Sequence, residues 1–283
     1  MSAPGPSSRA EHVVWLNGHL VPVAEARVPA TSATVTAGFG AFETLRMVGG
    51  RAPLAELHVE RLRRTCGELA LPDAGTDWGR VASELAERMG LPDSVVRITV
   101  GVEFALVTCE PLAASVTQER STGVDLHSVA LPRVPAGLKT TSRLPLVLAE
   151  RRAGGEVLLR GVAGEGLETS RANLFAVVGR ALYTAPTRAV LPGIARQLVL
   201  EIAQAQGVFT LECAPSALEL ADARELFLTN AVRGVRPVAS LDARALVLPD
   251  AESLTRRLQR ALDERMGIAD ELKTLSPATE GRE

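Results

Sequence analysis

Short runs of apolar and β-branched residues alternate with amphipathic stretches along the first half of the chain. Two such runs, at residues 13–16 and 20–23, flank Asn17-Gly18, a pair typical of a two-residue hairpin turn. Further strands are expected at residues 42–48, 95–102 and 105–108. Apolar residues at helical spacing predict two helices, at residues 54–69 and 78–88, and Gly90 should end the second.

The second half continues this mixture of strands and helices. Its helices are expected at residues 146–152, 193–206 and 253–266. Its strands are expected at residues 157–160, 174–178, 181–183, 208–213, 225–229 and 235–241. Because both halves mix the two kinds of element, the pattern predicts the α+β class.

Proline and glycine interrupt the pattern at residues 132–137, which predicts a linker between two domains. The linker would separate a small N-terminal domain, residues 11–131, from a larger C-terminal domain, residues 138–274. Residues 1–10 and 275–283 are expected to form a loose leader and a loose tail. Lys139 opens the second domain, close to the junction where ligand sites commonly form.

Composition excludes several classes of function. A formal net charge of −2 gives no field that would attract nucleic acid or an anionic membrane. No apolar run approaches the ~20 residues of a membrane-spanning helix, and the first residues lack the apolar stretch of a signal peptide. The three cysteines are scattered and the four histidines lack metal-ligand spacing. We therefore expect a cytoplasmic protein without a metal site.

Lys139 is the most informative single residue, because the sequence has only one other lysine, Lys273, against 29 arginines. Arginine stays protonated and cannot act as a nucleophile, whereas a desolvated lysine can lose its proton. A Schiff base with an aldehyde or ketone needs that free amine. The alternative is an ordinary surface lysine.

Four segments carry further candidate chemistry, each with an ordinary structural alternative. Arg61 shares an inward-facing helix surface with Leu57 and could meet a buried anion such as phosphate, or extend to water. Glu168 precedes a strand and could bind a cation in a cleft, or be a turn residue. The segments 191–196 and 228–234 could offer backbone amides to a phosphate, and the first would do so at the start of a helix. The alternatives are an ordinary helix start for the first segment and an ordinary turn for the second.

Taken together, the motifs resemble those of the class IV aminotransferases, the fold-type IV pyridoxal-phosphate (PLP) enzymes. The resemblance runs from about Val14 to Leu241. The matching motifs, in chain order, are Phe42-Glu43-Thr44 with Arg46, His58 with Arg61, Gly137-Leu138-Lys139, Gly155-Glu156-Val157-Leu158-Leu159, Glu168 with Asn173-Leu174-Phe175, Leu191-Pro192-Gly193-Ile194, and Thr229-Asn230-Ala231.

The resemblance implies a small N-terminal and a larger C-terminal α/β domain, with the cofactor at their junction, and a homodimer. Lys139 would form the Schiff base with PLP and later move the substrate proton, and Glu168 would keep the pyridine nitrogen protonated. The remaining cofactor-binding groups, most of them for the phosphate, would be Arg61, Ile194, Ala195, Asn230 and Ala231.

Within the family, the run at residues 229–238 and Arg143 resemble 4-amino-4-deoxychorismate lyase, which releases pyruvate to form p-aminobenzoate, a folate precursor. Arg46 and Arg97 are further candidates for binding a substrate carboxylate. Two alternatives remain: an aminotransferase for branched-chain or D-amino acids, and a non-catalytic homologue that binds PLP or a metabolite. Residues 101–104 stand where the lyases usually have an Arg-Gly loop, and this difference motivates both alternatives. Gly38-Phe39-Gly40 stands where the family usually has Gly-Asp-Gly, and this difference further motivates the non-catalytic alternative.

Overall fold

The turn at Asn17-Gly18 joins the first two strands, as the sequence predicts. Both residues have positive φ angles, 49° and 97°, which this type of hairpin turn requires. The computed structural model describes residues 12–72 and 75–268, so the predicted leader at 1–10 and tail at 275–283 lie outside the described residues.

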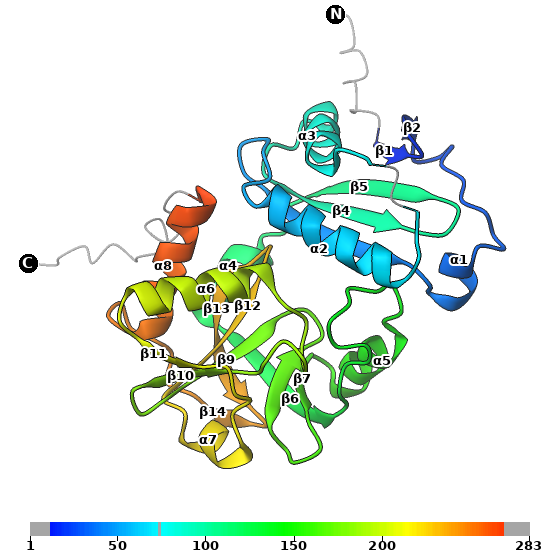
Figure 1. Cartoon of the computed structure of the whole chain (residues 1–283). Helices are drawn as coiled ribbons and strands as arrows, with labels where there is room; N and C mark the ends of the chain where they lie inside the picture. The colour runs from blue at the N-terminus through cyan, green and yellow to red at the C-terminus, as the bar shows by residue number, and fades with distance from the viewer. Residues whose placement is uncertain (1–11, 73–74, 269–283) are drawn as a thin grey trace, which may run out of the picture. The chain divides into compact units, whose positions relative to one another are not determined.

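The chain divides into two units, drawn in Figure 1 and each described here by itself. Unit 1 holds the described residues of Met1–Leu112 together with Lys139–Ser142, and unit 2 those of Ala113–Leu138 and Arg143–Glu283. This division differs from the sequence-based one, which placed the first boundary at residue 131 and Lys139 in the second domain. Strand pairing explains the difference, because apolar alternation does not reveal which sheet a strand joins.

Unit 1 is built on an antiparallel sheet in the order β2-β1-β5-β4-β3. Its strands are β1 (Val13–Leu16), β2 (His19–Pro22), β3 (Ala41–Met47), β4 (Ser94–Val100) and β5 (Ala105–Pro111). Its helices are α1 (Ala33–Ala37), α2 (Ala55–Glu68) and α3 (Trp78–Met89). Leu62 and Val81 of the two longer helices pack on Leu45 and Ile98 of the sheet, so one sheet face forms the core of the unit.

Unit 2 contains a sheet whose strands follow the order β11-β10-β9-β12-β13-β6-β7-β8, with β14 beside β13. Its strands are β6 (Val124–Ala130), β7 (Glu156–Arg160), β8 (Gly166–Thr169), β9 (Asn173–Val178), β10 (Ala181–Thr184), β11 (Phe209–Leu211), β12 (Glu225–Asn230), β13 (Gly234–Leu241) and β14 (Arg244–Ala245). Its helices are α4 (Ser115–Thr122), α5 (Leu144–Ala153), α6 (Ile194–Ala205), α7 (Ala217–Asp222) and α8 (Leu254–Met266). The strand β8 also pairs with β9 where Glu168 lies opposite Asn173, so the path from β9 through β12 to β8 closes on itself.

Every strand and helix predicted from the sequence is present, with ends displaced by a few residues. The sequence analysis missed the short elements α1, β8, α7 and β14, together with α4 and β6. Helix α4 has no apolar stripe to reveal it, since its buried residues are Val116 and an arginine, Arg120. Strand β6 pairs with β13 and β7, but its sequence lacks an apolar run. Four of its seven residues are polar or small and are at least partly exposed.

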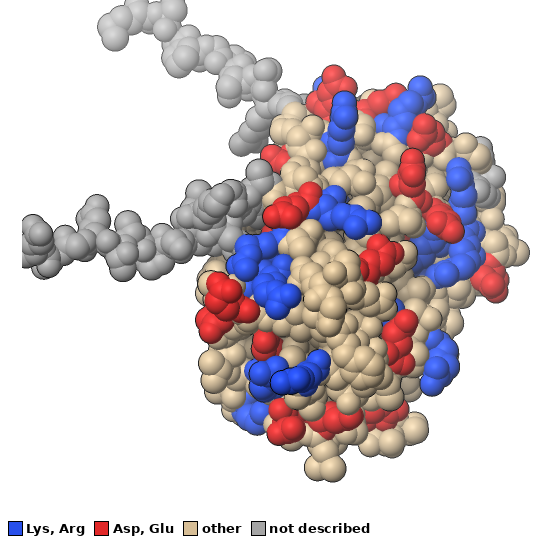
Figure 2. Space-filling model, turned by 60° about the vertical axis from the view of Figure 1, so that its left-hand side comes forward, with Lys and Arg blue, Asp and Glu red and all other residues tan. Residues whose placement is uncertain are grey.

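On the face drawn in Figure 2, acidic and basic side chains are interspersed. Among the described residues, no helix combines the length and the apolar character needed to cross a bilayer.

Candidate active site

Lys139 is fixed against the edge strand of unit 1. Its carbonyl oxygen accepts a hydrogen bond from the Phe42 backbone N–H at 2.9 Å, and the Thr141 N–H donates to the Gly40 carbonyl at 2.8 Å. Thr140 forms an antiparallel bridge with Ala41. The segment thus lies along the start of β3 like a short extra strand, and the Lys139 Nζ lies 4.7 Å from the centre of the Phe42 ring.

Two of the predicted substrate-binding arginines share one face of the sheet with Phe42. Side chains alternate along a strand, so Phe42 and Arg46 point away from the face that carries Leu45. Arg97 lies opposite Thr44 in the register between β3 and β4, and its guanidinium carbon is 3.8 Å from the centre of the Phe42 ring. Unit 1 therefore brings Lys139 and Arg97 to the same aromatic ring.

The opposite face carries a buried ionic cluster. The Glu43 carboxylate, whose side chain is fully buried, accepts hydrogen bonds from Arg61 Nε at 2.7 Å and Nη2 at 2.9 Å. His58 Nδ1 lies 2.8 Å from the same carboxylate. Arg61 is therefore buried rather than extended to water, and its guanidinium binds the Glu43 carboxylate of the same unit.

The cluster lowers the pKa of both Glu43 and His58. Burial alone would raise the pKa of Glu43, but the charge of Arg61, the hydrogen bonds from His58 and Arg61, and the charge of Lys139 together hold it well below its ordinary value. Burial lowers the pKa of His58, and the charges of Arg61 and Lys139 lower it further, against the opposing effect of Glu43. The cluster is therefore an ionised Glu43 with a neutral His58 at physiological pH.

Glu168 is the centre of a second buried cluster, in unit 2. Its carboxylate accepts hydrogen bonds from Arg133 Nε, from the Leu191 backbone N–H at 3.2 Å and from Asn173 Nδ2 at 3.3 Å. The Glu168 side chain is 2% exposed. Asn173 also donates to the Leu191 carbonyl at 2.9 Å, so it ties β8 to the loop that precedes α6.

The predicted phosphate-binding segments meet at Asn173. It lies opposite Thr229 in the pairing of β9 with β12, and a Cβ placed on Gly193 would lie 2.0 Å from its Oδ1 atom. Gly193 is the N-cap of α6 and no side chain caps the first amides, those of Ile194 and Ala195. Thr229 Oγ1 is buried and has no hydrogen-bond partner among the described residues.

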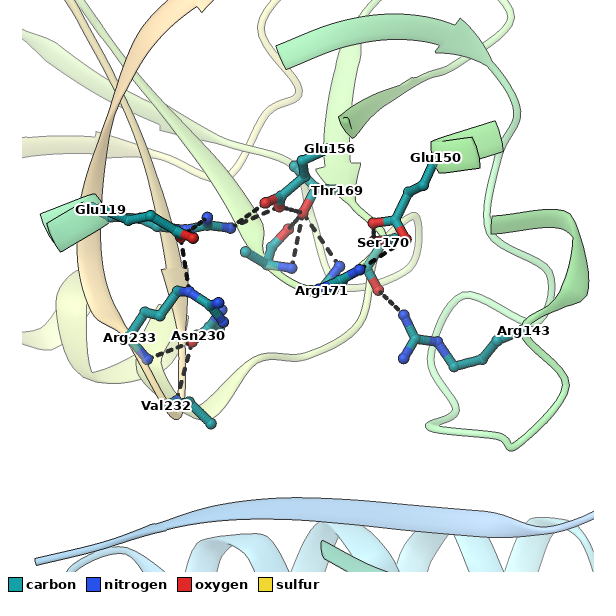
Figure 3. Close-up of polar contacts among 12 residues, drawn as sticks. Glu119, Arg143, Glu150, Glu156, Thr169, Ser170, Arg171, Asn230, Val232 and Arg233 are labelled. Atoms are coloured by element: carbon teal, nitrogen blue, oxygen red, sulfur yellow. Dashed lines mark hydrogen bonds and ion pairs between the residues drawn. The ribbon is translucent and has the colours of Figure 1, made fainter. Parts of the chain in front are cut away.

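Asn230 shapes the turn that follows Thr229. Figure 3 shows its side-chain oxygen accepting hydrogen bonds from the backbone N–H groups of Val232 at 3.0 Å and Arg233 at 2.7 Å. Its carboxamide oxygen is thus occupied within the turn.

Arg143, the third predicted substrate-binding arginine, belongs to unit 2. Its Nη2 donates to the Ser170 carbonyl at 3.1 Å, as Figure 3 shows. Burial and the charges of Arg133 and Arg171 lower the pKa of its guanidinium, although arginine remains charged at any ordinary pH. Its guanidinium is thus a half-buried cation held next to Ser170.

Sequence analysis gave no role to four residues that the structure makes prominent: Glu43, Arg133, Asn173 and Thr229. Three of them stand inside the motifs already quoted, so their positions were visible but their partners were not. Arg133 lies in the proline-rich segment at 132–137, which reads as a linker, and no sequence signal marked it.

Comparisons with known proteins show the family of this chain. The family model for amino-transferase class IV matches residues 40–241. The aminodeoxychorismate lyase of Vibrio harveyi is 29% identical over 275 residues, covering 88% of this chain and 99% of that protein.

Two further similar proteins are aminotransferases. A probable branched-chain-amino-acid aminotransferase of Thermotoga maritima is 30% identical, covering 71% of this chain and 77% of that protein. The structure of a hypothetical aminotransferase from Mycobacterium tuberculosis, bound to α-ketoglutarate and pyridoxamine phosphate, superposes with a TM-score of 0.80 at 25% identity, covering 88% of this chain and 98% of that one. With the family model matching most of its length, the chain belongs to the class IV aminotransferases, a family of PLP-dependent enzymes.

Proposed function

We propose that this enzyme is a 4-amino-4-deoxychorismate lyase that releases pyruvate and leaves p-aminobenzoate, a folate precursor. The observation that carries the proposal is the match to the Vibrio harveyi lyase, which spans 99% of that protein. The resemblance of Arg143 and of residues 229–238 to the lyases supports it. Branched-chain enzymes usually carry a tyrosine soon after the lysine, and the sole tyrosine of this chain, Tyr183, instead lies on β10 with its hydroxyl bonded to Glu219.

The residues present fit PLP as the cofactor. A phosphate needs donors in a place that the backbone can approach closely, and the uncapped start of α6 behind Gly193 offers them. The unpartnered hydroxyl of Thr229 is a further donor. We propose that Ile194, Ala195 and Ala231 bind the phosphate through their backbone amides, with Asn230 holding the turn of Ala231 in shape.

Arg61 is proposed as the cationic phosphate ligand, with Glu43 holding its guanidinium in place. The two bonds to Glu43 use Nε and Nη2 and fix the plane of the group. Because Arg61 is buried and its orientation is set by Glu43, little side-chain entropy remains to be lost when an anion binds.

Lys139 and Glu168 are proposed as the two residues that act on the reacting part of the cofactor. When bound, PLP supplies an electron-accepting ring to which an amine substrate is joined. Glu168 would hold a proton on the ring nitrogen, because its buried carboxylate is kept in place by three donors. The Lys139 Nζ would bind the cofactor and then carry the substrate proton, from a backbone held firmly against β3.

Arg46, Arg97 and Arg143 are proposed to bind the carboxylates of the substrate. Arg97 shares the Phe42 ring with Lys139, which places a cation beside the reactive amine. Residues 101–104, which differ from the lyase pattern, form the turn between β4 and β5. The Gly101 N–H donates to the Phe104 carbonyl at 2.7 Å, and Glu103 is hydrogen bonded to the Ser32 hydroxyl. In this chain, the turn therefore supplies a carboxylate where the lyases usually have an arginine.

The proposal predicts turnover of aminodeoxychorismate without any amino acceptor. Purified, PLP-loaded protein should release pyruvate and p-aminobenzoate in equal amounts when no 2-oxo acid is present. Protein without PLP is the control. Protein that carries bound PLP in its visible spectrum but releases neither product would contradict the lyase assignment.

An aminotransferase acting on a branched-chain or D-amino acid is the second candidate. The altered turn at residues 101–104 and the 30% identity to the Thermotoga maritima protein favour it. This activity requires both an amino acid and a 2-oxo acid and follows ping-pong kinetics. The same preparation distinguishes the two, because only an aminotransferase needs the second substrate.

We also propose that the enzyme is a homodimer and that it acts in the cytoplasm. Light scattering on the PLP-loaded protein should give about twice the 29.9 kDa of one chain. A mass of one chain at assay concentrations would contradict the dimer, and recovery of the native protein outside the cytoplasmic fraction would contradict the location.

A further inference from the structure

Arg133 is a charged partner of Glu168. Its Nε donates to Glu168 Oε1, and its Nη2 donates to the Ser170 carbonyl at 3.2 Å. The Arg133 side chain is 13% exposed and that of Glu168 is 2% exposed, so the ion pair is largely shielded from water.

The other donors to Glu168 named above are neutral. The Leu191 N–H is shared between the two carboxylate oxygens, at 3.3 Å and 3.2 Å, and Asn173 Nδ2 reaches Oε2 at 3.3 Å. These bonds are long for N–H donors, whereas a guanidinium makes a shorter and stronger charge-assisted bond. Of these three donors, Arg133 therefore contributes most to fixing the orientation of the carboxylate.

Charge matters as much as orientation. Burial disfavours an ionised carboxylate, and a neighbouring cation restores the ionised form. A protonated carboxyl group accepts hydrogen bonds weakly, so it would hold a protonated ring nitrogen poorly.

We infer that Arg133 is a positioning residue for the cofactor, which acts by keeping Glu168 ionised and aimed at the ring nitrogen. The inference rests on the proposed role of Glu168 and assigns a function to a residue in what the sequence presents as a linker. Arg133 itself would not touch substrate.

A cofactor analogue tests this directly. In 1-deazapyridoxal 5′-phosphate a C–H group replaces the ring nitrogen, so the contact with Glu168 cannot form. The dissociation constants of PLP and of the analogue, measured on the full chain after removal of cofactor, give a preference ratio that reports on that contact alone. A variant whose fold is generally less stable binds both ligands more weakly, so the ratio of the two dissociation constants stays unchanged.

Arg133→Gln should lower the preference for PLP about 10-fold, as expected when a charge-assisted hydrogen bond is lost. Glu168→Gln should lower it similarly, and the double variant should lower it no further, because both act on one contact. Arg133→Met serves the same purpose if the glutamine variant does not fold.

Arg171→Gln is the matched control. Arg171 directly follows Ser170, whose carbonyl accepts from Arg133, and its guanidinium pairs with Glu150 at 3.0 Å. Its loss should leave the preference ratio unchanged.

The outcomes separate this inference from the proposed function. An unchanged ratio in the Arg133 variants, together with a lowered ratio in Glu168→Gln, would overturn the role of Arg133 and leave that of Glu168 standing. An unchanged ratio in Glu168→Gln would remove the proposed role of Glu168 and the inference with it.

Discussion

Replacing Lys139 with alanine is expected to lower the activity by about 10³-fold or more, the largest effect of any single substitution in this enzyme. In the proposed mechanism the substitution removes both the amine that binds the cofactor and the group that moves the substrate proton, and proton transfer alone contributes up to about 10⁴-fold. The measurement is the initial rate of pyruvate and p-aminobenzoate release at saturating PLP.

Two control variants make that result specific. Lys139→Arg keeps a positive charge on the same backbone but cannot act as a nucleophile, so it should be equally inactive. Lys273→Ala removes the only other lysine and should retain the activity of the parent protein. Full activity in Lys139→Ala would refute every catalytic role given to this residue.

Replacing Glu43 with glutamine is expected to cause the largest loss of stability, about 3–5 kcal/mol, the usual cost of removing one partner of a buried ion pair. Arg61 would keep its buried charge without a carboxylate, and the single amide oxygen of glutamine could not accept from both Arg61 and His58. Both tryptophans, Trp15 and Trp78, lie in unit 1 with ring centres 5.5 Å apart, so their fluorescence during urea unfolding reports on the unit that contains the cluster.

An exposed ion pair in the same unit provides the control. Arg80 and Glu84 lie one turn apart on α3, 3.4 Å from each other, with side chains 73% and 50% exposed. Glu84→Gln should change the stability by less than about 0.5 kcal/mol. Equal effects of the two substitutions would show that the Glu43 cluster does not stabilise unit 1.

The same cluster gives the stability of unit 1 a defined dependence on pH. The folded pKa values of Glu43 and His58 both lie below their unfolded values of about 4.3 and about 6.5. Their contributions are therefore present above those unfolded values and are lost as the pH falls: that of His58 below about 6.5 and that of Glu43 below about 4.3. In Glu43→Gln, the loss below about 4.3 should be smaller than in the parent protein.

Much of the fold was visible in the sequence because its longer elements follow simple periodicity. The Asn17-Gly18 turn, the helix that ends at Gly90 and most strands of the two sheets are confirmed. The pairing of strands was not visible, since alternation fixes which side of a strand is buried but not its neighbour. For this reason the return of Lys139 to the edge of β3 was missed.

The candidate site shows the same limit at the level of side chains. Motif spacing singled out Lys139, Glu168 and Arg61, which all lie within the range that the family model matches. Motif spacing gave no indication that Glu43 binds Arg61 or that Arg133 binds Glu168. The partners in each pair lie in different segments, and the sequence does not reveal which segments are in contact. The roles themselves remain proposals.

The most direct test of the account is to find where PLP is attached. The two lysines make the measurement unambiguous: borohydride reduction of the PLP-loaded protein fixes the cofactor on its lysine, and peptide mass spectrometry then identifies that residue. We predict stoichiometric labelling of the peptide that contains Lys139. Labelling of Lys273 instead, or no labelling of a protein that binds PLP, would contradict the central claim.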